Sequence, residues 1–281
     1  MPLTLTQSEF DLLRNFIKTE CGIDLPDGKE YLIESRLSNL MAISGSKSYL
    51  DLYHKASRDK TNKFRDKIID AITTNETSWF RDDHPYTVLE KYVLPERIKY
   101  FMNKKTRKIR IWSAACSTGQ EPYSIAMIIN QLLENPEFRN MNIGNFEILA
   151  TDISNSALLM AKLGRYDSIS MSRGIPELYL NKYFKKQKRV WILNDEIKKI
   201  VTFKKFNLQN PIDQFGLFDI VFCRNVAIYF SEKFKIQLFD NIASQLKPDG
   251  YFFMGSAESI SNYSNRFNIK RFDNSICYQI K

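Results

Sequence analysis

The residues best suited to chemistry follow short apolar runs, where strands would end. One such run, 111–114, leads into small residues and then into a helical segment that begins near Glu121. In an α/β sheet this turn lies at the carboxyl end of a strand, where ligands bind. Small side chains, beginning with Ala114, let a ligand approach the backbone closely. Gly119 is the only glycine of the turn, so the three-glycine dinucleotide pattern is absent and a plain tight turn is nearly as good an explanation.

Asp152 directly follows a second apolar run, 148–151. An acid at this place can accept hydrogen bonds from both hydroxyls of a ribose. It lies 33 residues beyond Gly119, whereas the usual spacing is roughly 20, and the loop 135–145 can absorb the difference. Alone, Asp152 could simply cap the next helix. Together, the turn and the acid favour an adenosine-bearing cofactor.

Two further polar segments stay open on spacing alone. Asn207 could bond an adenine edge while Leu208 packs on the ring, or it could be an ordinary turn asparagine. The segment 73–82 is dense in hydrogen-bonding side chains and, without context, reads as a helix-capping loop. Within it, Arg81 could meet a carboxylate bidentately.

An almost wholly apolar run, 217–223, ends abruptly in Arg224 and Asn225. Such a run is expected for a strand that is covered on both faces. Charged and polar groups at the end of a buried strand are more often functional than structural. Tyr229 follows four residues after Asn225, and the alternative for it is a core aromatic with its hydroxyl at the rim.

The elements that must position these residues fall into two kinds. Helical periodicity dominates 1–75, where Thr6 and Glu9 have the spacing of a capping box. A linker and helix over 76–107 end in a basic stretch. From 108 to 281, β-type runs alternate with helical ones, which predicts an α/β domain with a mostly parallel sheet and helices on both faces.

The expected elements can be bounded from the same patterns. We expect helices over 29–43, 49–56, 64–72, 82–97, 121–133, 156–163 and 231–246. We expect strands over 109–114, 146–151, 201–206, 217–223, 251–255 and 276–280, with a turn at 247–250. The segment 164–200 interrupts the alternation and reads as a small inserted subdomain. A long irregular crossover loop is the less favoured alternative, because structureless loops of that length are uncommon.

Composition limits the class of protein. The chain has 281 residues and a net charge of +9, which suggests an acidic partner: nucleic acid, an anionic membrane surface or an acidic protein. Its four cysteines are too far apart in sequence for a metal-type pair, so we expect no metal site and free thiols in a reducing cytoplasm. No stretch approaches the roughly 20 apolar residues that a membrane-spanning helix needs.

These segments, in this order, resemble the CheR-type chemotaxis receptor methyltransferases. The resemblance covers residues 10–278. Its most specific strings are Thr-Asn-Glu-Thr-x-x-Phe-Arg-Asp, Ser-Thr-Gly-x-Glu-Pro-Tyr-Ser, Ala-Thr-Asp-Ile and Phe-Cys-Arg-Asn-Val-x-Ile-Tyr-Phe. The resemblance implies a Rossmann-like sheet that binds S-adenosylmethionine, an N-terminal helical domain that docks the substrate, and an inserted antiparallel β subdomain over about 164–200 that some members use to grip a receptor tail.

The resemblance also implies the roles of individual residues. Arg36 would face the receptor and Tyr229 would lie beside the reacting methyl group. The remaining residues would form the cofactor pocket: Asn75, Thr77 and Arg81 near the methionine end, Glu121 near its amino group, Asp152 on the ribose, Asn207 and Leu208 at the adenine, and Arg224 and Asn225 completing the walls.

By this resemblance, the activity is methyl transfer from S-adenosylmethionine to glutamate side chains of chemotaxis receptors, leaving S-adenosylhomocysteine. A glutamate has a reference pKa of about 4.3, so at neutral pH it is already the nucleophile and no general base is required. The partners expected are acidic receptor helices, which would bring a cytoplasmic monomer to the membrane. Nucleic acid is not expected, because no Asn/Asp-Pro-Pro-Tyr motif follows 217–223. A cofactor sensor without turnover is the remaining alternative, and the retained Arg81, Asp152, Asn225 and Tyr229 argue against it.

Overall fold

The computed structural model describes residues 4–104, 108–272 and 275–281, so residues 105–107 of the predicted linker and residues 1–3 lie outside the described parts. The α-helices are α1 (Gln7–Cys21), α2 (Glu30–Ser44), α3 (Tyr49–Arg58), α4 (Lys63–Ile72), α5 (His84–Val88), α6 (Leu94–Lys104), α7 (Gln120–Leu132), α8 (Asn155–Leu163), α9 (Ser168–Ser172), α10 (Glu177–Tyr183), α11 (Asp195–Lys198) and α12 (Glu232–Gln245). The segment η1 (Leu89–Val93) is a π-helix, and the 3-10 turns are η2 (Pro136–Phe138), η3 (Ile143–Asn145), η4 (Asp213–Phe215) and η5 (Ala227–Tyr229).

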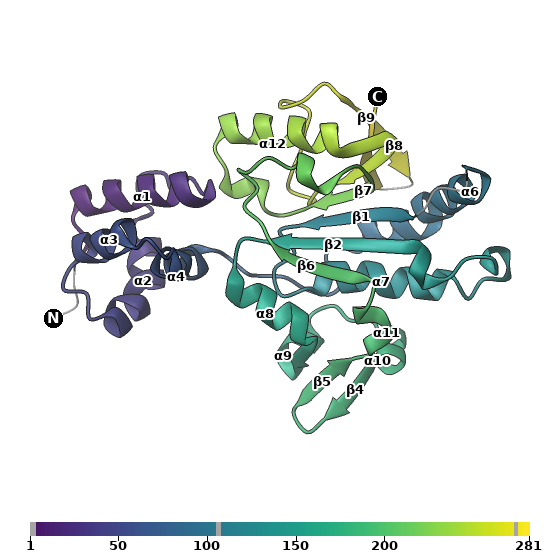
Figure 1. The fold of residues 1–281 in the computed structure, drawn as a ribbon, viewed down its shortest axis with the longest axis horizontal. Helices are drawn as coiled ribbons and strands as arrows, with labels where there is room; N and C mark the ends of the chain where they lie inside the picture. Colours follow the sequence, from purple (N-terminus) through teal and green to yellow (C-terminus); the bar gives the residue numbers. More distant parts are fainter. Residues whose placement is uncertain (1–3, 105–107, 273–274) are drawn as a thin grey trace.

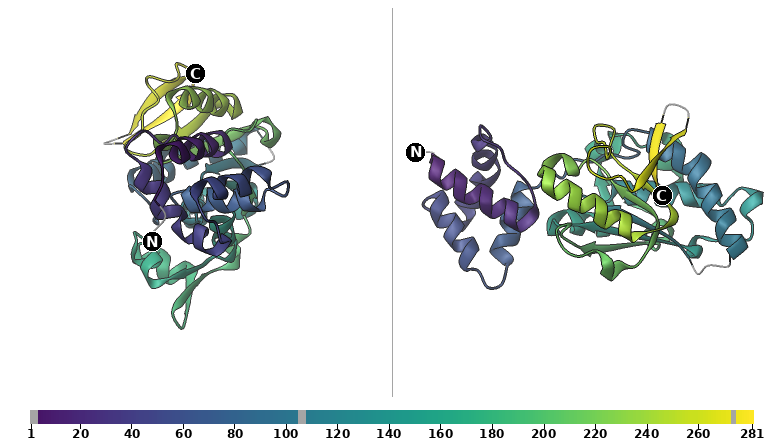
Figure 2. Two further views of the ribbon diagram at one scale, coloured as in Figure 1. Left: turned by 90° about the vertical axis from the view of Figure 1, so that its left-hand side faces the viewer. Right: turned by 90° about the horizontal axis from the view of Figure 1, so that it is seen from above.

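Helices α1 to α4 form an N-terminal bundle with its own hydrophobic core. Helix α1 begins as its sequence predicts: the Thr6 side chain accepts from the Glu9 backbone N–H, and the Glu9 carboxylate accepts from the Thr6 N–H. Its apolar positions Phe10, Leu13 and Ile17 are buried in the bundle. Figures 1 and 2 show the bundle at one end of the molecule, beside the main sheet.

The strands form two sheets. They are β1 (Ile109–Ala114), β2 (Phe146–Asp152), β3 (Arg165–Asp167), β4 (Phe184–Gln187), β5 (Val190–Leu193), β6 (Val201–Lys205), β7 (Phe218–Cys223), β8 (Leu246–Phe253), β9 (Phe267–Phe272) and β10 (Ser275–Ile280). The larger sheet has the order β6-β2-β1-β7-β8-β10-β9. The first five strands of this order, from β6 through β2, β1 and β7 to β8, each pair in parallel with the next. Strand β10 pairs antiparallel with both β8 and β9. The predicted α/β architecture with a mostly parallel sheet is confirmed.

Strand β7 shows why the sheet needs helices on both faces. Ile220 and Phe222 belong to one core, which includes residues of α6 and α7, whereas Val221 and Cys223 belong to the other, which includes residues of α12. All six residues of the strand are buried. In Figure 1, α12 lies on the opposite side of the sheet from α7. A strand covered on both faces needs no polar alternation, so its sequence is apolar except for Asp219. The buried Asp219 carboxylate accepts from the Arg110 N–H and from the Lys247 ammonium.

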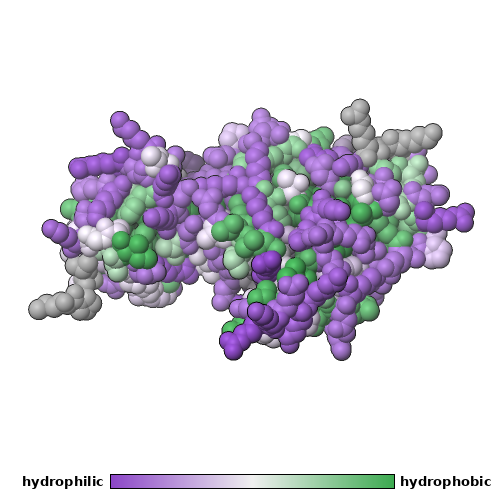
Figure 3. Space-filling view, turned by 60° about the horizontal axis from the view of Figure 1, so that its bottom comes forward, coloured by the Kyte–Doolittle hydropathy of each residue, from purple (hydrophilic) through white to green (hydrophobic). Residues whose placement is uncertain are grey.

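The segment between β2 and β6 contains the predicted antiparallel insert. Its three strands have the order β3-β5-β4, and both pairings are antiparallel. The irregular-loop alternative is therefore wrong. Trp79 anchors this subdomain, because its ring packs edge-on against Tyr166 and Phe184 at centroid distances of 4.9 Å and 5.3 Å. Figure 3 views the side from which the subdomain projects and shows a mostly hydrophilic surface with separate hydrophobic patches.

The region after α12 differs from the prediction in two ways. The expected turn at 247–250 lies inside strand β8, where the pairing with β7 shifts register between Phe218 and Ile220. A bulge absorbs the turn-forming residues, and Asp249 adopts a left-handed conformation (φ 59°). Strand β9, at the edge of the sheet, was not predicted. Only Phe267 of that strand is buried, so its sequence lacks a clear apolar pattern.

Candidate active site

The predicted site residues meet where β1, β2, β6 and β7 end. A cavity of about 930 Å³, which includes its open mouth, lies against these strand ends. The predicted residues that line it are Asn75, Thr77, Arg81, Glu121, Asp152, Asn207, Leu208, Arg224, Asn225 and Tyr229. Two predicted residues do not line it. Ala114 ends β1 in the core, and the wall is formed by Ala115 to Ser117; Arg36 lies on α2, outside the lining.

Asp152 is fixed by backbone groups of the two turns that meet beside it. One carboxylate oxygen accepts from the Ser117 N–H at 2.7 Å and the other from the Ser154 N–H at 2.9 Å. The cap of α8 is Ser154 rather than Asp152. Burial raises the pKa of Asp152, and the backbone donors oppose that rise. The remaining lone pairs of this oriented carboxylate suit the two hydroxyls of a ribose.

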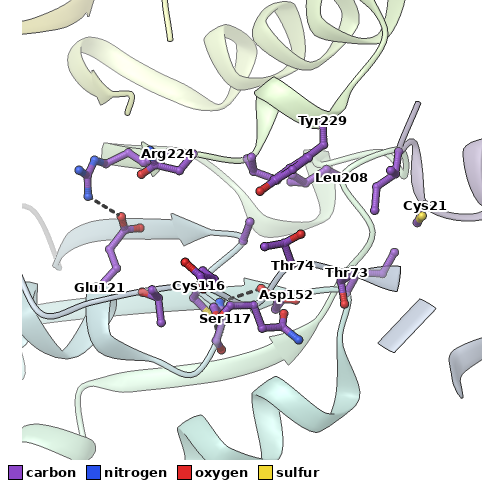
Figure 4. A pocket seen from close by; sticks show the side chains of 18 of the residues that line it. Cys21, Thr73, Thr74, Cys116, Ser117, Glu121, Asp152, Leu208, Arg224 and Tyr229 are labelled. Atoms are coloured by element: carbon purple, nitrogen blue, oxygen red, sulfur yellow. Dashed lines mark hydrogen bonds and ion pairs between the residues drawn. The ribbon is translucent and has the colours of Figure 1, made fainter. Parts of the chain in front are cut away.

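Glu121 stands on the first turn of α7 and is only 9% exposed. The Ser113 hydroxyl donates to one of its carboxylate oxygens at 2.8 Å, and the Arg224 guanidinium donates to the other at 3.1 Å. Burial raises the pKa of Glu121, while the positive charge of Arg224 opposes the rise. Figure 4 shows Arg224 and Tyr229 on one wall of the pocket and Glu121, Ser117 and Asp152 on the other.

Arg224 joins Glu121 to a second acid that sequence reasoning left without a role. Its Nη2 donates to Asp82 at 2.9 Å and to the Arg81 carbonyl at 2.7 Å. Burial opposes ionisation of Asp82, but hydrogen bonds from Ser256 and the charge of Arg224 lower its pKa overall. The signal in the sequence was the place of Asp82 at the end of the Thr-Asn-Glu-Thr-x-x-Phe-Arg-Asp string, directly after Arg81.

The backbone around Arg81 is held in an uncommon conformation. Phe80, Asp82 and Asp83 have φ values of 47°, 68° and 42°. Non-glycine residues with positive φ cluster at functional sites, where the surroundings hold them in place. Here the bonds from Arg224 to Asp82 and to the Arg81 carbonyl do so. They fix the segment from which Arg81 borders the pocket.

Asn207 lies at the pocket, but its side chain is hydrogen-bonded within the protein. Its Nδ2 donates to the Glu20 carbonyl at 2.8 Å, and its Oδ1 accepts from the Gln209 N–H at 3.0 Å. The turn interpretation therefore describes its side-chain contacts, and contact with adenine stays a prediction. The same region carries a bridge between Ile23 and Phe230, so the N-terminal bundle is joined directly to the pocket wall.

Arg36 also acts within the protein. Its guanidinium donates to the Ile72 carbonyl and, at 2.8 Å, to the Thr74 hydroxyl. Thr74 lines the pocket, so Arg36 supports the lining from behind. Its contact with a receptor stays a prediction.

Comparison with known proteins decides the family. The family described as CheR methyltransferase, SAM binding domain, matches residues 75–276, and the CheR methyltransferase all-alpha domain matches residues 8–73. Chemotaxis protein methyltransferase Cher2 of Pseudomonas putida is 40% identical over 97% of this chain and 98% of its own. Chemotaxis protein methyltransferase 1 of Pseudomonas aeruginosa is 40% identical over 99% of this chain and 100% of its own. The chain belongs to the CheR methyltransferase family.

As a CheR methyltransferase, the protein is an enzyme of chemotaxis that uses S-adenosylmethionine. The pocket fits this cofactor chemically. A buried carboxylate, Glu121, suits an ammonium group, Asp152 suits vicinal hydroxyls, and the buried Phe206 and Leu208 suit an aromatic base. Within the described residues, none of the helices is both long and apolar enough to cross a membrane.

Proposed function

We propose that this CheR methyltransferase esterifies glutamate side chains of methyl-accepting chemotaxis receptors. S-adenosylmethionine supplies the methyl group, and the products are a glutamate methyl ester and S-adenosylhomocysteine. The observation that carries the proposal is a pocket whose two buried acids, Glu121 and Asp152, are already hydrogen-bonded and which neither histidine lines. Such a site lacks a ready general base, so it suits a nucleophile that arrives ionised.

The pKa values of candidate acceptors separate the alternatives. A carboxylate acceptor is ionised at neutral pH, whereas a lysine acceptor, with a reference pKa of about 10.4, must first lose a proton. Glu121 is bonded to Ser113 and Arg224, and Asp152 is bonded to two backbone N–H groups. Taking up a proton would remove the negative charge that strengthens these bonds, so the carboxylate acceptor is favoured.

Positioning is then the main task of the protein, and it can supply much of the rate enhancement. Tyr229 reaches into the pocket from η5 (Figure 4). Its hydroxyl can hold the acceptor carboxylate without the full ion pair that would retard a reaction in which that carboxylate loses charge. We assign Tyr229 to orientation of the acceptor, Arg81 to the methionine end of the cofactor, and Arg36 to docking.

The receptor partner is favoured by charge. The net charge of +9 suits the acidic helices that carry receptor methylation sites. The N-terminal bundle lies against the pocket wall through the Ile23–Phe230 bridge, so a helix docked on the bundle would reach the pocket. We propose that a cytoplasmic monomer meets the membrane only through its receptors.

The test is transfer of labelled methyl from S-adenosylmethionine to receptor-containing membranes, with release of the label as methanol in base. Base-labile label on receptors is the expected result. Cofactor binding without any receptor labelling would contradict the proposal.

For Tyr229→Phe we expect kcat to fall about tenfold with little change in cofactor Kd, since one hydrogen bond to an ionised group is lost. Full turnover in Tyr229→Phe, with lost turnover but normal receptor binding in Arg36→Ala, would reverse the two assignments.

A further inference from the structure

Glu258 lies outside the pocket lining but binds the loop that forms one of its walls. The carboxylate accepts from four backbone N–H groups. One oxygen bonds Asn225 at 2.7 Å and Gly255 at 2.8 Å, and the other bonds Val226 at 3.1 Å and Ala227 at 2.9 Å. A single side chain therefore ties the loop after β7 to the loop after β8.

The three successive N–H groups of Asn225 to Ala227 converge on one anion. This arrangement matches the concave backbone sites in which proteins bind phosphate and other anions. Here the anion is a side chain of the protein itself. Asn225 has a left-handed backbone (φ 58°), a conformation that is uncommon outside glycine and that asparagine tolerates better than most residues. The charge-assisted bonds from Glu258 hold the backbone in this conformation.

Gly255 shows that the two loops fit closely. A Cβ at this position would lie 2.6 Å from the side-chain nitrogen of Asn225 and 2.9 Å from its backbone nitrogen. The absence of a side chain lets the Gly255 N–H share the same carboxylate as Asn225. Asn225 is thus packed by Gly255 and bonded by Glu258.

The loop that Glu258 holds carries residues of the cofactor pocket. Asn225 and Val226 line the cavity, and Tyr229 follows in η5, with its N–H bonded to the Val226 carbonyl at 3.1 Å. We propose that Glu258 is a positioning residue, which fixes the backbone of Asn225 to Ala227 so that the Asn225 side chain is presented to S-adenosylmethionine.

The inference requires only that the enzyme binds its cofactor, and the test uses cofactor binding for that reason. Glu258→Gln keeps the shape of the side chain but turns one acceptor oxygen into a donor that faces backbone N–H groups. We expect the Kd for S-adenosylhomocysteine, measured by calorimetry on the full chain, to rise about tenfold. Glu232→Gln is the matched control, because Glu232 is exposed and pairs with Lys235. The Kd of this control variant for S-adenosylhomocysteine should stay unchanged.

A double-mutant cycle distinguishes positioning from general stability. Asn225→Gly removes the side chain, and glycine accepts the same positive φ, so adding Glu258→Gln to it should weaken binding less than twofold further. A double variant whose loss of affinity equals the product of the two single losses would overturn the inference. So would a folded Glu258→Gln variant with a Kd within twofold of wild type. If Glu258→Gln does not fold, Glu258→Asp is judged by the same cycle and thresholds. Failure of wild-type enzyme to label receptors would instead refute the proposed function and leave this result standing.

Discussion

Replacing Arg224 with methionine removes the cation that two acids share. Counting side-chain atoms only, Arg224 is 1% exposed, its partner Glu121 is 12% exposed and its partner Asp82 is 27% exposed. Asp82 can regain water after the change more readily than Glu121, whose side chain is less exposed. Leaving a buried charge without its partner costs about 3–5 kcal/mol, so we expect the free energy of unfolding to fall by that amount.

The matching variants test the cause of that loss. In the double variant Arg224→Met with Glu121→Gln, the uncompensated charge is gone, and we expect about half of the lost stability to return. Arg14→Met is the control, because Arg14 pairs with Asp11 and Asp27 at the surface and should contribute less than about 1 kcal/mol. The measurement is urea unfolding followed by tryptophan fluorescence.

The pH dependence gives an independent check. Burial raises the pKa of Glu121 in the folded protein, and Arg224 opposes that rise. Without Arg224 the folded pKa lies further above the unfolded value, so the ionised acid destabilises the variant at neutral pH. That penalty is relieved as pH falls towards the folded pKa, so Arg224→Met should gain stability relative to wild type below neutral pH. A loss under about 1 kcal/mol, or no relative gain at lower pH, would refute the reasoning.

Two further predictions concern the pocket and the insert. Asp152→Asn should weaken binding of S-adenosylhomocysteine roughly 10- to 100-fold in calorimetry, because the hydrogen bonds of a charged acceptor are lost; an unchanged Kd would remove Asp152 from the site. Gly174→Ala should lower the free energy of unfolding by about 1–3 kcal/mol more than Gly45→Ala does. Both glycines have positive φ, but a Cβ at Gly174 would collide with the Trp79 carbonyl oxygen, whereas one at Gly45 would meet nothing within 4 Å. If the two variants lose the same free energy of unfolding in urea, the backbone at Trp79 can move away from the added Cβ without cost.

Much of the site could be predicted because its residues follow apolar runs. Asp152 and Arg224 each come directly after a predicted strand, and the carboxyl ends of parallel strands meet at one edge of a sheet. Chain order and strand type therefore place these residues together without any knowledge of side-chain contacts. The buried strand β7 was equally clear, since both of its faces are covered.

Contacts between distant segments could not be predicted. Asp82 meets Arg224 across 142 positions, and Asn207 meets Glu20 across 187. Nothing in the local sequence distinguishes an asparagine that faces adenine from one that holds a neighbouring domain. Edge strand β9 escaped for a related reason, because a half-exposed strand leaves a weak apolar pattern.

The sequence by itself determined the α/β alternation, the strand ends that carry the site and, through its motifs, the family. Tertiary structure alone decided how the site is held: Arg224 between Glu121 and Asp82, and Glu258 beneath Asn225. The physical reason is the range of the interactions. Apolar periodicity follows from the local geometry of helices and strands, whereas the partner of a buried charge is set by which loops the folded sheet brings together.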